Sequence, residues 1–248
     1  MATARNQPIG YVLYEGPSML DGSPIVVILT GTGRKGSANE KTGNMLQTYI
    51  LRRDMLPTEA VKSGADSALC GQCPHRPSTG GACYVNVGQG PQAIYRAWLR
   101  GAYPVLLYPE TVVRGRVVRI GAYGDPAAAP VGIWADLLQG TAGHTGYTHQ
   151  WANPQGAALR SLVMASVDSE TEALQARALG WRTFRVTVPG AQPGPGEFTC
   201  PASSEAGKRS TCAQCQACDG ALRGSRKASP VIVVHGSKQR RFIALAVA

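Results

Sequence analysis

Seven cysteines, gathered in two short segments that lie far apart in the sequence, constrain this chain more than any other feature. An odd number of cysteines cannot all pair as disulfides within one chain. In a reducing compartment, clustered cysteines are more often metal ligands or catalytic groups than disulfide partners. We therefore predict that all seven bind metal. The first group consists of Cys70, Cys73 and Cys83, and the second of Cys200, Cys212, Cys215 and Cys218.

The second group has the spacing of an iron–sulfur ligand set. Eleven residues separate Cys200 from Cys212, and two residues separate each later cysteine from the next. A CxxCxxC run with one remote cysteine is typical of the [4Fe–4S] clusters of bacterial ferredoxins, whereas structural zinc usually takes two CxxC-type pairs. The spacing predicts a [4Fe–4S] cluster here, with zinc as the alternative.

The first group supplies only three thiolates, a CxxC pair followed after nine residues by Cys83. Such a site either takes a fourth ligand or leaves one metal position open. His75, inside the same loop, is the obvious additional ligand. If His75 binds, the result is a closed Cys3His zinc site, which is a structural arrangement. If it does not, an open iron of a second cluster can bind a small molecule, and both alternatives stay open at this point.

Length and composition favour one soluble domain. With 248 residues, 44% of them hydrophobic, the chain can bury a full core, and about 250 residues is the usual size of one α/β barrel. The chain lacks a run of about 18 apolar residues that would span a bilayer. Its start, MATARNQPIG, lacks the apolar core of a signal peptide. We expect a cytoplasmic protein without membrane contact, and its oligomeric state is not predicted.

The charge of the chain predicts an anionic partner. The formal net charge is +10 and the pI is near 9.5, which creates a field that attracts DNA, RNA or a phosphate-bearing small molecule. Aromatic residues are only 6% of the chain, so the stacking platform of single-strand binders is not expected. The basic residues are densest near the end of the chain, at Arg223, Arg226, Lys227, Lys238, Arg240 and Arg241.

Apolar runs and helix-forming segments alternate along most of the chain. Helices are expected from Pro57, from Pro91 to the residue before Gly101, over VGIWADLLQ, and from Ser169, which has Glu172 in capping-box spacing, to Gly180. Alternation of this kind predicts parallel strands with crossover helices, and functional groups at the carboxyl ends of the strands. Strands are expected in the segments 25–29, 45–51, 114–126, 144–151, 163–169, 181–188, 230–236 and 241–247.

The predicted fold class is therefore α/β, a partial (β/α) barrel with parallel strands, an N-terminal strand pair and a C-terminal cysteine-rich metal-binding extension. Residues 1–44 are expected to form the N-terminal strands and loop, and residues 45–190 the partial barrel with the three-cysteine loop. Residues 191–248 are expected to form the four-cysteine extension and the closing strands.

This layout resembles the radical S-adenosylmethionine (radical SAM) enzymes. These have a three-cysteine loop after an early strand, a partial β/α barrel and, in some members, an auxiliary cluster near the end. Their usual loop reads CxxxCxxC, which differs from the spacing here. The resemblance implies that the first cysteine group holds a [4Fe–4S] cluster whose fourth iron binds S-adenosylmethionine, which is cleaved reductively to an adenosyl radical. It also implies that Gly121, Tyr123, Gly124 and Asp125, in the turn GAYGDP, meet this cofactor, with Asp125 as the acidic partner.

A second resemblance concerns exact phrases of the sequence. CPHRP, ACYVNVGQGP, GAYGDP, GYTHQW and ASVDS are similar to uncharacterised cysteine-rich proteins carried by phages and other mobile elements. No activity can be carried over from these proteins. The resemblance implies a place in the cytoplasm of a bacterial host and a role in DNA or RNA transactions.

Three residues are candidates for catalysis: Asp125, His149 and Asp168. His149 stands beside Gln150 at an expected strand end, and the alternative is a structural, hydrogen-bonded histidine. Asp168 stands where an expected strand gives way to a helix, a position that suits both a functional group and a helix N-cap. His144 and His149 are expected on opposite faces of a strand. The same is expected of Arg182 and Arg185, and His235 is expected to be structural.

Two functions follow. The first is an iron–sulfur protein, radical-SAM-like in its chemistry, that acts on a nucleic-acid or phosphate-bearing substrate with one or two [4Fe–4S] clusters and S-adenosylmethionine as cofactors. The second is a non-enzymatic, zinc-binding and basic nucleic-acid-binding protein of a phage or plasmid.

Overall fold

The computed structural model of the chain describes residues 8–33, 40–221 and 227–246. In these residues, nine strands form a single mixed, mostly parallel sheet that does not close on itself. The strands are β1 (Gly10–Pro17), β2 (Pro24–Thr30), β3 (Leu46–Arg52), β4 (Val117–Tyr123), β5 (Gly143–Thr148), β6 (Met164–Val167), β7 (Thr183–Thr187), β8 (Glu197–Thr199) and β9 (Ser229–Val233).

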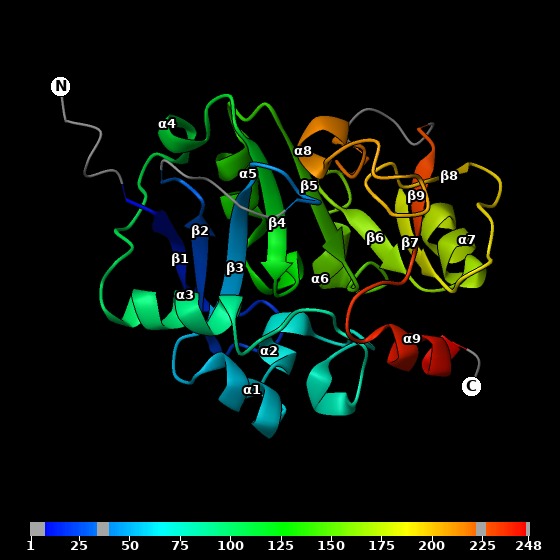
Figure 1. The fold of residues 1–248 in the computed structure, drawn as a ribbon. Coiled ribbons are helices and arrows are strands. Elements are labelled where there is room, and N and C mark those ends of the chain that lie inside the picture. The colour runs from blue at the N-terminus through cyan, green and yellow to red at the C-terminus, as the bar shows by residue number, and fades with distance from the viewer. Residues whose placement is uncertain (1–7, 34–39, 222–226, 247–248) are drawn as a thin grey trace.

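The strands lie side by side in the order β1-β2-β3-β4-β5-β6-β7-β9-β8 (Figure 1). β1, β2 and β3 pair in antiparallel fashion, as the strands of hairpins do. From β3 onward every pairing is parallel. The carboxyl ends of the strands from β3 to β7 and of β9 therefore meet at one edge of the sheet, where parallel α/β proteins gather their functional groups.

Residue type explains why β2 lies inside the sheet and not at its edge. Its residues from Ile25 to Leu29 are all fully buried, and such a β-branched, unbroken apolar run fits a strand that is covered on both faces. β5 differs, since its first half pairs with β4 and its second half, from Tyr147, pairs with β6. β5 therefore joins the two halves of the sheet, and the candidate residue His149 stands just past its end.

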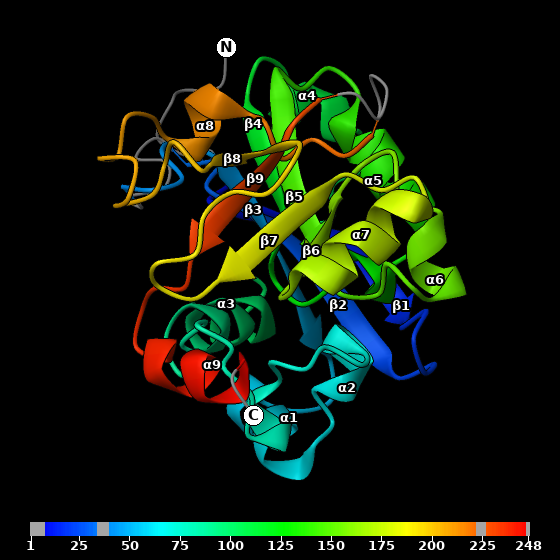
Figure 2. The same ribbon diagram turned by 90° about the vertical axis from the view of Figure 1, so that its right-hand side faces the viewer.

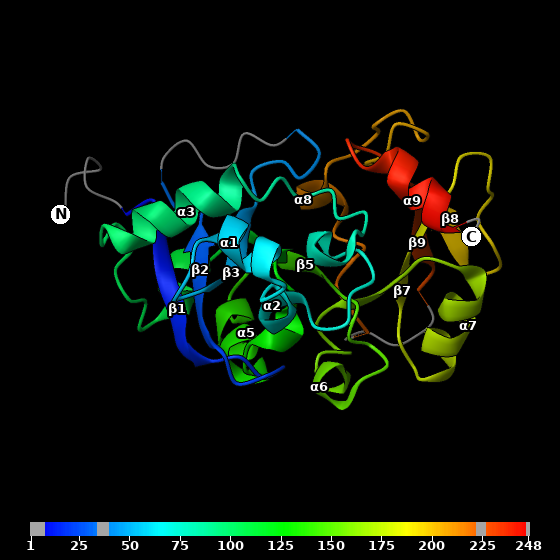
Figure 3. The same ribbon diagram turned by 90° about the horizontal axis from the view of Figure 1, so that it is seen from below.

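The helices are divided between the two faces of the sheet. Figures 2 and 3 show α5, α6 and α7 on one face and α8 and α9 on the other, while α1 and α2 lie near the carboxyl end of β3. The α-helices are α1 (Pro57–Ser63), α2 (Ser67–Cys70), α3 (Gly90–Leu99), α4 (Pro109–Val113), α5 (Val131–Leu138), α6 (Pro154–Ala157), α7 (Glu170–Ala178), α8 (Cys212–Cys215) and α9 (Gln239–Ala246), and the short 3-10 helices are η1 (Pro77–Thr79) and η2 (Pro126–Ala128).

Part of the hydrophobic core lies between the sheet and α5. Val118 and Ile120 of β4 are fully buried there, together with Trp134 and Leu137 of α5. The indole of Trp134 donates a hydrogen bond to the carbonyl of Pro126 at 3.0 Å, so its polar atom is satisfied as well. The residues between these core positions along β4 face the other side of the sheet, where the cysteines lie.

Most of the predicted elements are confirmed, including the expected helices and the strands at 25–29 and 45–51. The strand predicted at the end of the chain is wrong, because residues Gln239–Ala246 form the helix α9. An apolar run of this length fits a strand or a helix, and only its packing decides between them. As a helix the segment turns Phe242 inward and leaves most of its other side chains exposed. Strands β1 and β8 were not predicted.

The three predicted segments share one sheet. Strands β1 and β2 come from residues 1–44, and β8 and β9 come from residues 191–248.

Among the described residues, none of the helices has the length and apolar character needed to cross a bilayer.

A buried ion pair at the far edge of the sheet generates a stability prediction. Glu197 of β8 accepts hydrogen bonds from Arg185 of β7 (2.6 Å) and Arg177 of α7 (3.0 Å), and its side chain is 2% exposed. Burial alone would raise the pKa of Glu197, but the bonds from Arg185 and the neighbouring charges lower it. We expect Glu197→Gln to reduce the free energy of unfolding by about 3–5 kcal/mol, because two cations lose their partner.

Urea denaturation at neutral pH measures this loss. The matched control is Asp54→Asn, because Asp54 also pairs with an arginine, Arg52, but its own side chain is 43% exposed. We expect this variant to lose less than about 1 kcal/mol of unfolding free energy. A carboxyl with a lowered pKa stabilises the fold only while it is ionised. The difference between wild type and Glu197→Gln should therefore shrink as the pH falls below about 4.3. Equal losses in the two variants would contradict the prediction.

Candidate functional site

A cavity of about 480 Å³ lies on the face of the sheet opposite α5. Every second residue of the strands lines this cavity, because alternate side chains of a pleated strand point to the same face of the sheet. Its size is that of a small-molecule site, about 300–1,000 Å³. The strand residues on its wall include Arg119, Gly121 and Tyr123 of β4, Thr145 and Tyr147 of β5, Phe184 and Val186 of β7, and Pro230 and Ile232 of β9.

Both cysteine groups face this one cavity. All seven cysteines line it, and none of them forms a disulfide. The first group follows β3 and lies at the carboxyl ends of the strands. The second group lies beside β5, where the amide of Gly146 donates to the carbonyl of Cys218 at 3.1 Å. The fold thus brings together two sets of thiols that the sequence separates.

The sulfur atoms are not packed around a single point. Among the described residues, neither cysteine group contains three ligand atoms within 4.8 Å of one another. A tetrahedral zinc with Zn–S bonds of about 2.3 Å needs sulfurs about 3.8 Å apart. A cubane cluster holds each thiolate on a different iron and so spaces the sulfurs more widely. Burial raises the pKa of the Cys73 thiol to about 12 and also raises the pKa of Cys218, so a metal must displace these protons to bind.

Several hydrogen bonds fix the loop that carries the first group. The carbonyl of Cys70 accepts from the side-chain amide of Gln150 at 3.0 Å, and the amide of Cys83 donates to the carbonyl of His75 at 2.8 Å. Gly71 has φ = +53°, and a side chain on it would meet the amide of Gln150 at 2.5 Å. The CGQC turn therefore needs glycine at this position, both for its backbone conformation and for its close approach to Gln150.

Asp125, predicted as a catalytic and cofactor-binding residue, is a buried carboxylate on the cavity wall. It accepts hydrogen bonds from the hydroxyl of Thr148 (2.7 Å) and from the amides of Ala127 (3.0 Å) and His149 (2.8 Å). Burial raises its pKa to about 6, although these bonds lower it. Its own amide donates to the carbonyl of Leu69 at 2.7 Å. Asp125 thus joins the first cysteine loop to the ends of β4 and β5.

The other residues predicted to bind a cofactor lie in the same turn. Gly121, Tyr123 and Gly124 all line the cavity. Burial raises the pKa of Tyr123, and the neighbouring Cys70 adds to this effect. The turn therefore lies against the first cysteine group, and its role in cofactor binding stays a prediction.

His149 and Asp168, predicted as catalytic, come together with His75. Nε2 of His75 and Oδ2 of Asp168 are 2.7 Å apart, and the rings of His75 and His149 meet edge to face at 5.5 Å between centroids. Burial lowers the pKa of His149 to about 4, so its imidazole is neutral at pH 7. Asp168 is not a helix N-cap, because Ser169 caps α7 by accepting from the amide of Glu172. His75 is directed toward Asp168. Among the described residues, the group of three potential ligands within 4.8 Å of one another that includes His75 consists of His75, His149 and Asp168, and it contains no cysteine.

Arg182 anchors the segment that follows the second cysteine group. Its guanidinium donates to Oδ1 of Asp219 at 2.5 Å and to the carbonyls of Ala217 (2.8 Å) and Gly220 (2.8 Å), and its side chain is 2% exposed. A capping box between Thr211 and Gln214 starts α8 within the CAQC turn. Both devices fix the backbone on which three of the four thiols stand.

Three residues with weaker predictions are structural in the described chain. Nε2 of His144 donates a hydrogen bond to the carbonyl of Leu162 at 2.7 Å. Arg185 pairs with Glu197, and neither Arg182 nor Arg185 lines the cavity. His235 lies on the cavity wall but is exposed, with Nε2 3.0 Å from Nζ of Lys41.

Sequence reasoning missed a cation and two phenols of the cavity. Arg119 of β4 lies on the cavity wall and donates to the hydroxyl of Tyr84 at 2.6 Å, while Tyr147 of β5 lies beside Cys218. Arg119 forms no ion pair with a carboxylate of the described residues. Period-two alternation was the available signal, because Arg119 and Tyr147 stand two residues before the cavity residues Gly121 and His149.

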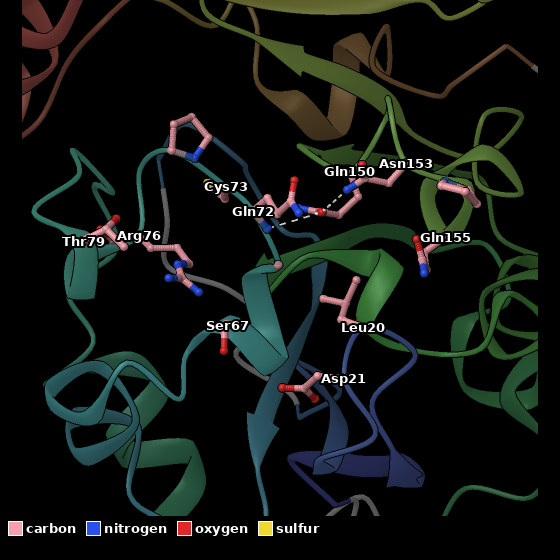
Figure 4. A pocket seen from close by; sticks show the side chains of 13 residues that line it. Leu20, Asp21, Ser67, Gln72, Cys73, Arg76, Thr79, Gln150, Asn153 and Gln155 are labelled. Carbon is pink, nitrogen blue, oxygen red and sulfur yellow. Dashed lines mark hydrogen bonds between the residues drawn. The ribbon is translucent and has the colours of Figure 1, made fainter.

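A second cavity, of about 630 Å³, lies on the outer side of the first cysteine loop (Figure 4). Gln150 stands in its wall, where its Oε1 accepts from the amide of Gln72 (3.4 Å) and the side chain of Asn153 (2.8 Å). Cys73 is the one cysteine that lines both cavities. The loop that carries Cys73 is therefore a thin wall between the two.

The basic residues near the end of the chain are in part engaged within the fold. Arg223 and Arg226 lie outside the described residues. Lys227 pairs with Asp219 at 3.2 Å, and Nε of Arg241 donates to the carbonyl of Gly80 at 2.7 Å. Binding to DNA or RNA stays a prediction, and a salt-dependent affinity would test it.

The chain matches no protein-family model, no curated protein and no solved structure. The resemblances to radical SAM enzymes and to phage proteins therefore stay predictions.

The role of Arg182 can be tested directly. We expect Arg182→Leu to reduce the free energy of unfolding by about 3–5 kcal/mol, because Asp219 loses a buried partner and several carbonyls lose their donors. Hydrogen exchange of residues 215–221 should also become faster. The control is Arg160→Leu, since Arg160 only donates to the carbonyl of Leu179 at the surface, and its loss should stay below about 1 kcal/mol. Unchanged exchange in Arg182→Leu would show that other contacts fix the segment.

Proposed function

We propose that this chain is an iron–sulfur protein in which both cysteine groups bind a [4Fe–4S] cluster beside one ligand cavity. The second group supplies four thiolates and closes its cluster, whereas the first supplies three and leaves one iron open. We further propose that the open iron binds S-adenosylmethionine, as in the radical SAM enzymes, and that the chain is an enzyme.

One observation carries the proposal. All seven cysteines line the same cavity, while neither group has three sulfurs within 4.8 Å of one another. The first fact gives the metals access to a common ligand, which buried structural zinc sites do not need. The second is compatible with the wider thiolate spacing of a cluster. The donor set fits, because thiolates are the ligands of [4Fe–4S] clusters and each group stands on a loop that internal hydrogen bonds fix.

The order of the strands supports the finer fold assignment. Six parallel strands follow one another as β3, β4, β5, β6, β7 and β9, interrupted in the sequence only by the edge strand β8. We interpret them as a partial (β/α) barrel, with residues 191–248 as its cysteine-rich extension. In this interpretation the three-cysteine loop follows the first barrel strand and the turn GAYGDP follows the second, as the resemblance to radical SAM enzymes implies.

The chain's own groups have separate tasks in this proposal. When bound, the open cluster supplies an electron for the reductive cleavage of S-adenosylmethionine. The turn from Gly121 to Asp125 faces the first cysteine group and offers backbone groups to the cofactor. Asp125 holds this turn and the backbone of His149 in place, because its carboxylate already accepts three hydrogen bonds. It is therefore a positioning residue.

The cavity also indicates a class of substrate. Arg119 places a guanidinium on the wall between the two cysteine groups, and among the described residues it forms no ion pair. Its donors suit a carboxylate or phosphate. Together with the net charge of +10, this supports a phosphate-bearing substrate, of which a nucleotide or nucleic acid is one form.

Iron analysis of anaerobically purified protein tests the metal assignment. We expect brown protein with about eight irons per chain. Cys73→Ser and Cys215→Ser should each remove about four of them, because each variant lacks a ligand of one cluster only, so that the two variants serve as controls for each other. Colourless protein with stoichiometric zinc would contradict the proposal and favour the zinc-stabilised, nucleic-acid-binding alternative.

Cleavage of S-adenosylmethionine tests the enzymatic part. With dithionite as reductant, the wild type should form 5′-deoxyadenosine, and Cys73→Ser should form none because its open cluster is lost. Chromatography of the reaction mixture measures the product. If the wild type carries an intact first cluster and still forms no 5′-deoxyadenosine, the clusters have a structural or electron-transfer role.

A further inference from the structure

Three side chains from separate segments converge on the cavity wall. His75 comes from the first cysteine loop, His149 from the end of β5 and Asp168 from the end of β6. One ligand atom of each lies within 4.8 Å of the other two, and in the described part of the chain no other three potential ligands are as close. The closest pair, Nε2 of His75 and Oδ2 of Asp168, is 2.7 Å apart.

Each of the three side chains also has a polar atom that is buried without a hydrogen-bond partner among the described residues. These atoms are Nδ1 of His75, Nε2 of His149 and Oδ1 of Asp168. A buried polar atom without a partner costs about 1–3 kcal/mol, and such atoms are rare in native structures. Nε2 of His149 and Oδ1 of Asp168 belong to one cluster of metal-binding side chains, and they point to an electrophile that binds at this place.

The backbone around the three residues is fixed by hydrogen bonds that do not use the ligand atoms. The amide of His149 donates to Oδ2 of Asp125 at 2.8 Å. The amide of Asp168 donates to Oε2 of Glu172 at 2.7 Å, just before the helix α7. The ring of His75 packs against Phe242 of α9, with 5.3 Å between centroids. Supporting contacts of this kind hold metal ligands in position before the ion binds.

We propose that His75, His149 and Asp168 bind one divalent transition-metal ion, separate from the metals of the two cysteine groups. Two imidazoles and one carboxylate are the ligand set of catalytic zinc sites and of mononuclear non-haem Fe²⁺ sites. Both kinds leave coordination positions open, and here the open positions face the cavity. Nε2 of His75 and the carboxylate of Asp168 both bind the ion after the proton of their hydrogen bond leaves Nε2, either by a shift of the neutral imidazole to the Nδ1–H tautomer or by release to solvent.

This inference does not depend on the identity of the metal at the cysteines, and it assigns His75 to a site other than the fourth ligand position of the first cysteine group. It also gives the cavity a Lewis acid that can bind water or an oxygen of the substrate. The ion would lie on the same wall as the first cysteine loop, since His75 belongs to that loop.

The test is Zn²⁺ binding by the full chain after anaerobic iron–sulfur reconstitution and removal of loose metal with a chelator. Calorimetry should detect about one Zn²⁺ per chain. Asp168→Asn, which keeps the shape of the side chain, and His149→Ala should each weaken this binding at least about 100-fold, because outer-shell changes alone cost about 10–100-fold. The control is His235→Ala, since His235 lines the same cavity outside the group, and its affinity should equal that of the wild type.

Co²⁺ identifies the ligands, because a cobalt ion on cysteine gives a sulfur-to-metal charge-transfer band that nitrogen and oxygen ligands do not give. We expect Co²⁺ at the saturated site to add its ligand-field bands to the spectrum and to leave the sulfur-to-metal charge-transfer absorption unchanged. Absence of the additional ion in the wild type, or equal binding in wild type and Asp168→Asn, would overturn the proposal. Circular dichroism and an unchanged iron content would show that each variant is folded.

The two proposals fail in distinguishable ways. If the cysteines take zinc instead of clusters, the wild type is colourless, but the difference of one ion between wild type and His149→Ala remains. If the clusters form and this difference is absent, only the His–His–Asp site is refuted.

Discussion

The buried carboxylate of Asp125 is the interaction on which the arrangement of the site depends. It accepts from Thr148 and from the amides of Ala127 and His149, and the amide of Asp125 donates to the carbonyl of Leu69. These bonds connect the end of β4, the end of β5 and the start of the first cysteine loop. A carboxylate that is removed from water needs several donors, and here each donor belongs to a segment that forms the cavity. The hydrogen bonds of Asp125 therefore hold the segments of the cavity wall together.

The two faces of the sheet then have different tasks. One face is covered by α5 and α7, which bury Trp134, Leu137 and the apolar side chains of β4. The other face is covered by the cysteine segments and α9, and its alternate residues Arg119, Tyr147 and Ser166 line the cavity together with the thiols. Period-two alternation lets each strand serve both purposes. The same strands stabilise the fold on one face and supply the site on the other.

Much of the fold could be predicted, because the signals were local. Pro57 and Ser169 mark helix starts, glycines end helices, and the apolar runs of β2 and β3 are unambiguous. The end of the chain could not be assigned, since Phe242 and its neighbours fit either a strand or a helix and tertiary packing made the choice. Of the candidate site, the cysteines could be identified by residue type and spacing, and Asp125, His149 and Asp168 by their places at the ends of expected strands. Their grouping was not predictable, because the sequence offered His75 only as an optional ligand of the neighbouring cysteines, whereas the structure places it against Asp168, just after β6.

By itself, the sequence determined which atoms can serve as metal ligands and which strands are parallel, because spacing and periodicity are local properties of the chain. It also determined that the first cysteine group lacks a fourth thiolate. Only the tertiary structure decided that both groups face one cavity and that Arg119 lies between them. Only it brought His75, His149 and Asp168 within reach of a single ion. The reason is physical: neighbouring parallel strands deliver residues that are distant in sequence to one edge of the sheet, and the buried bonds of Asp125 fix which of them meet there.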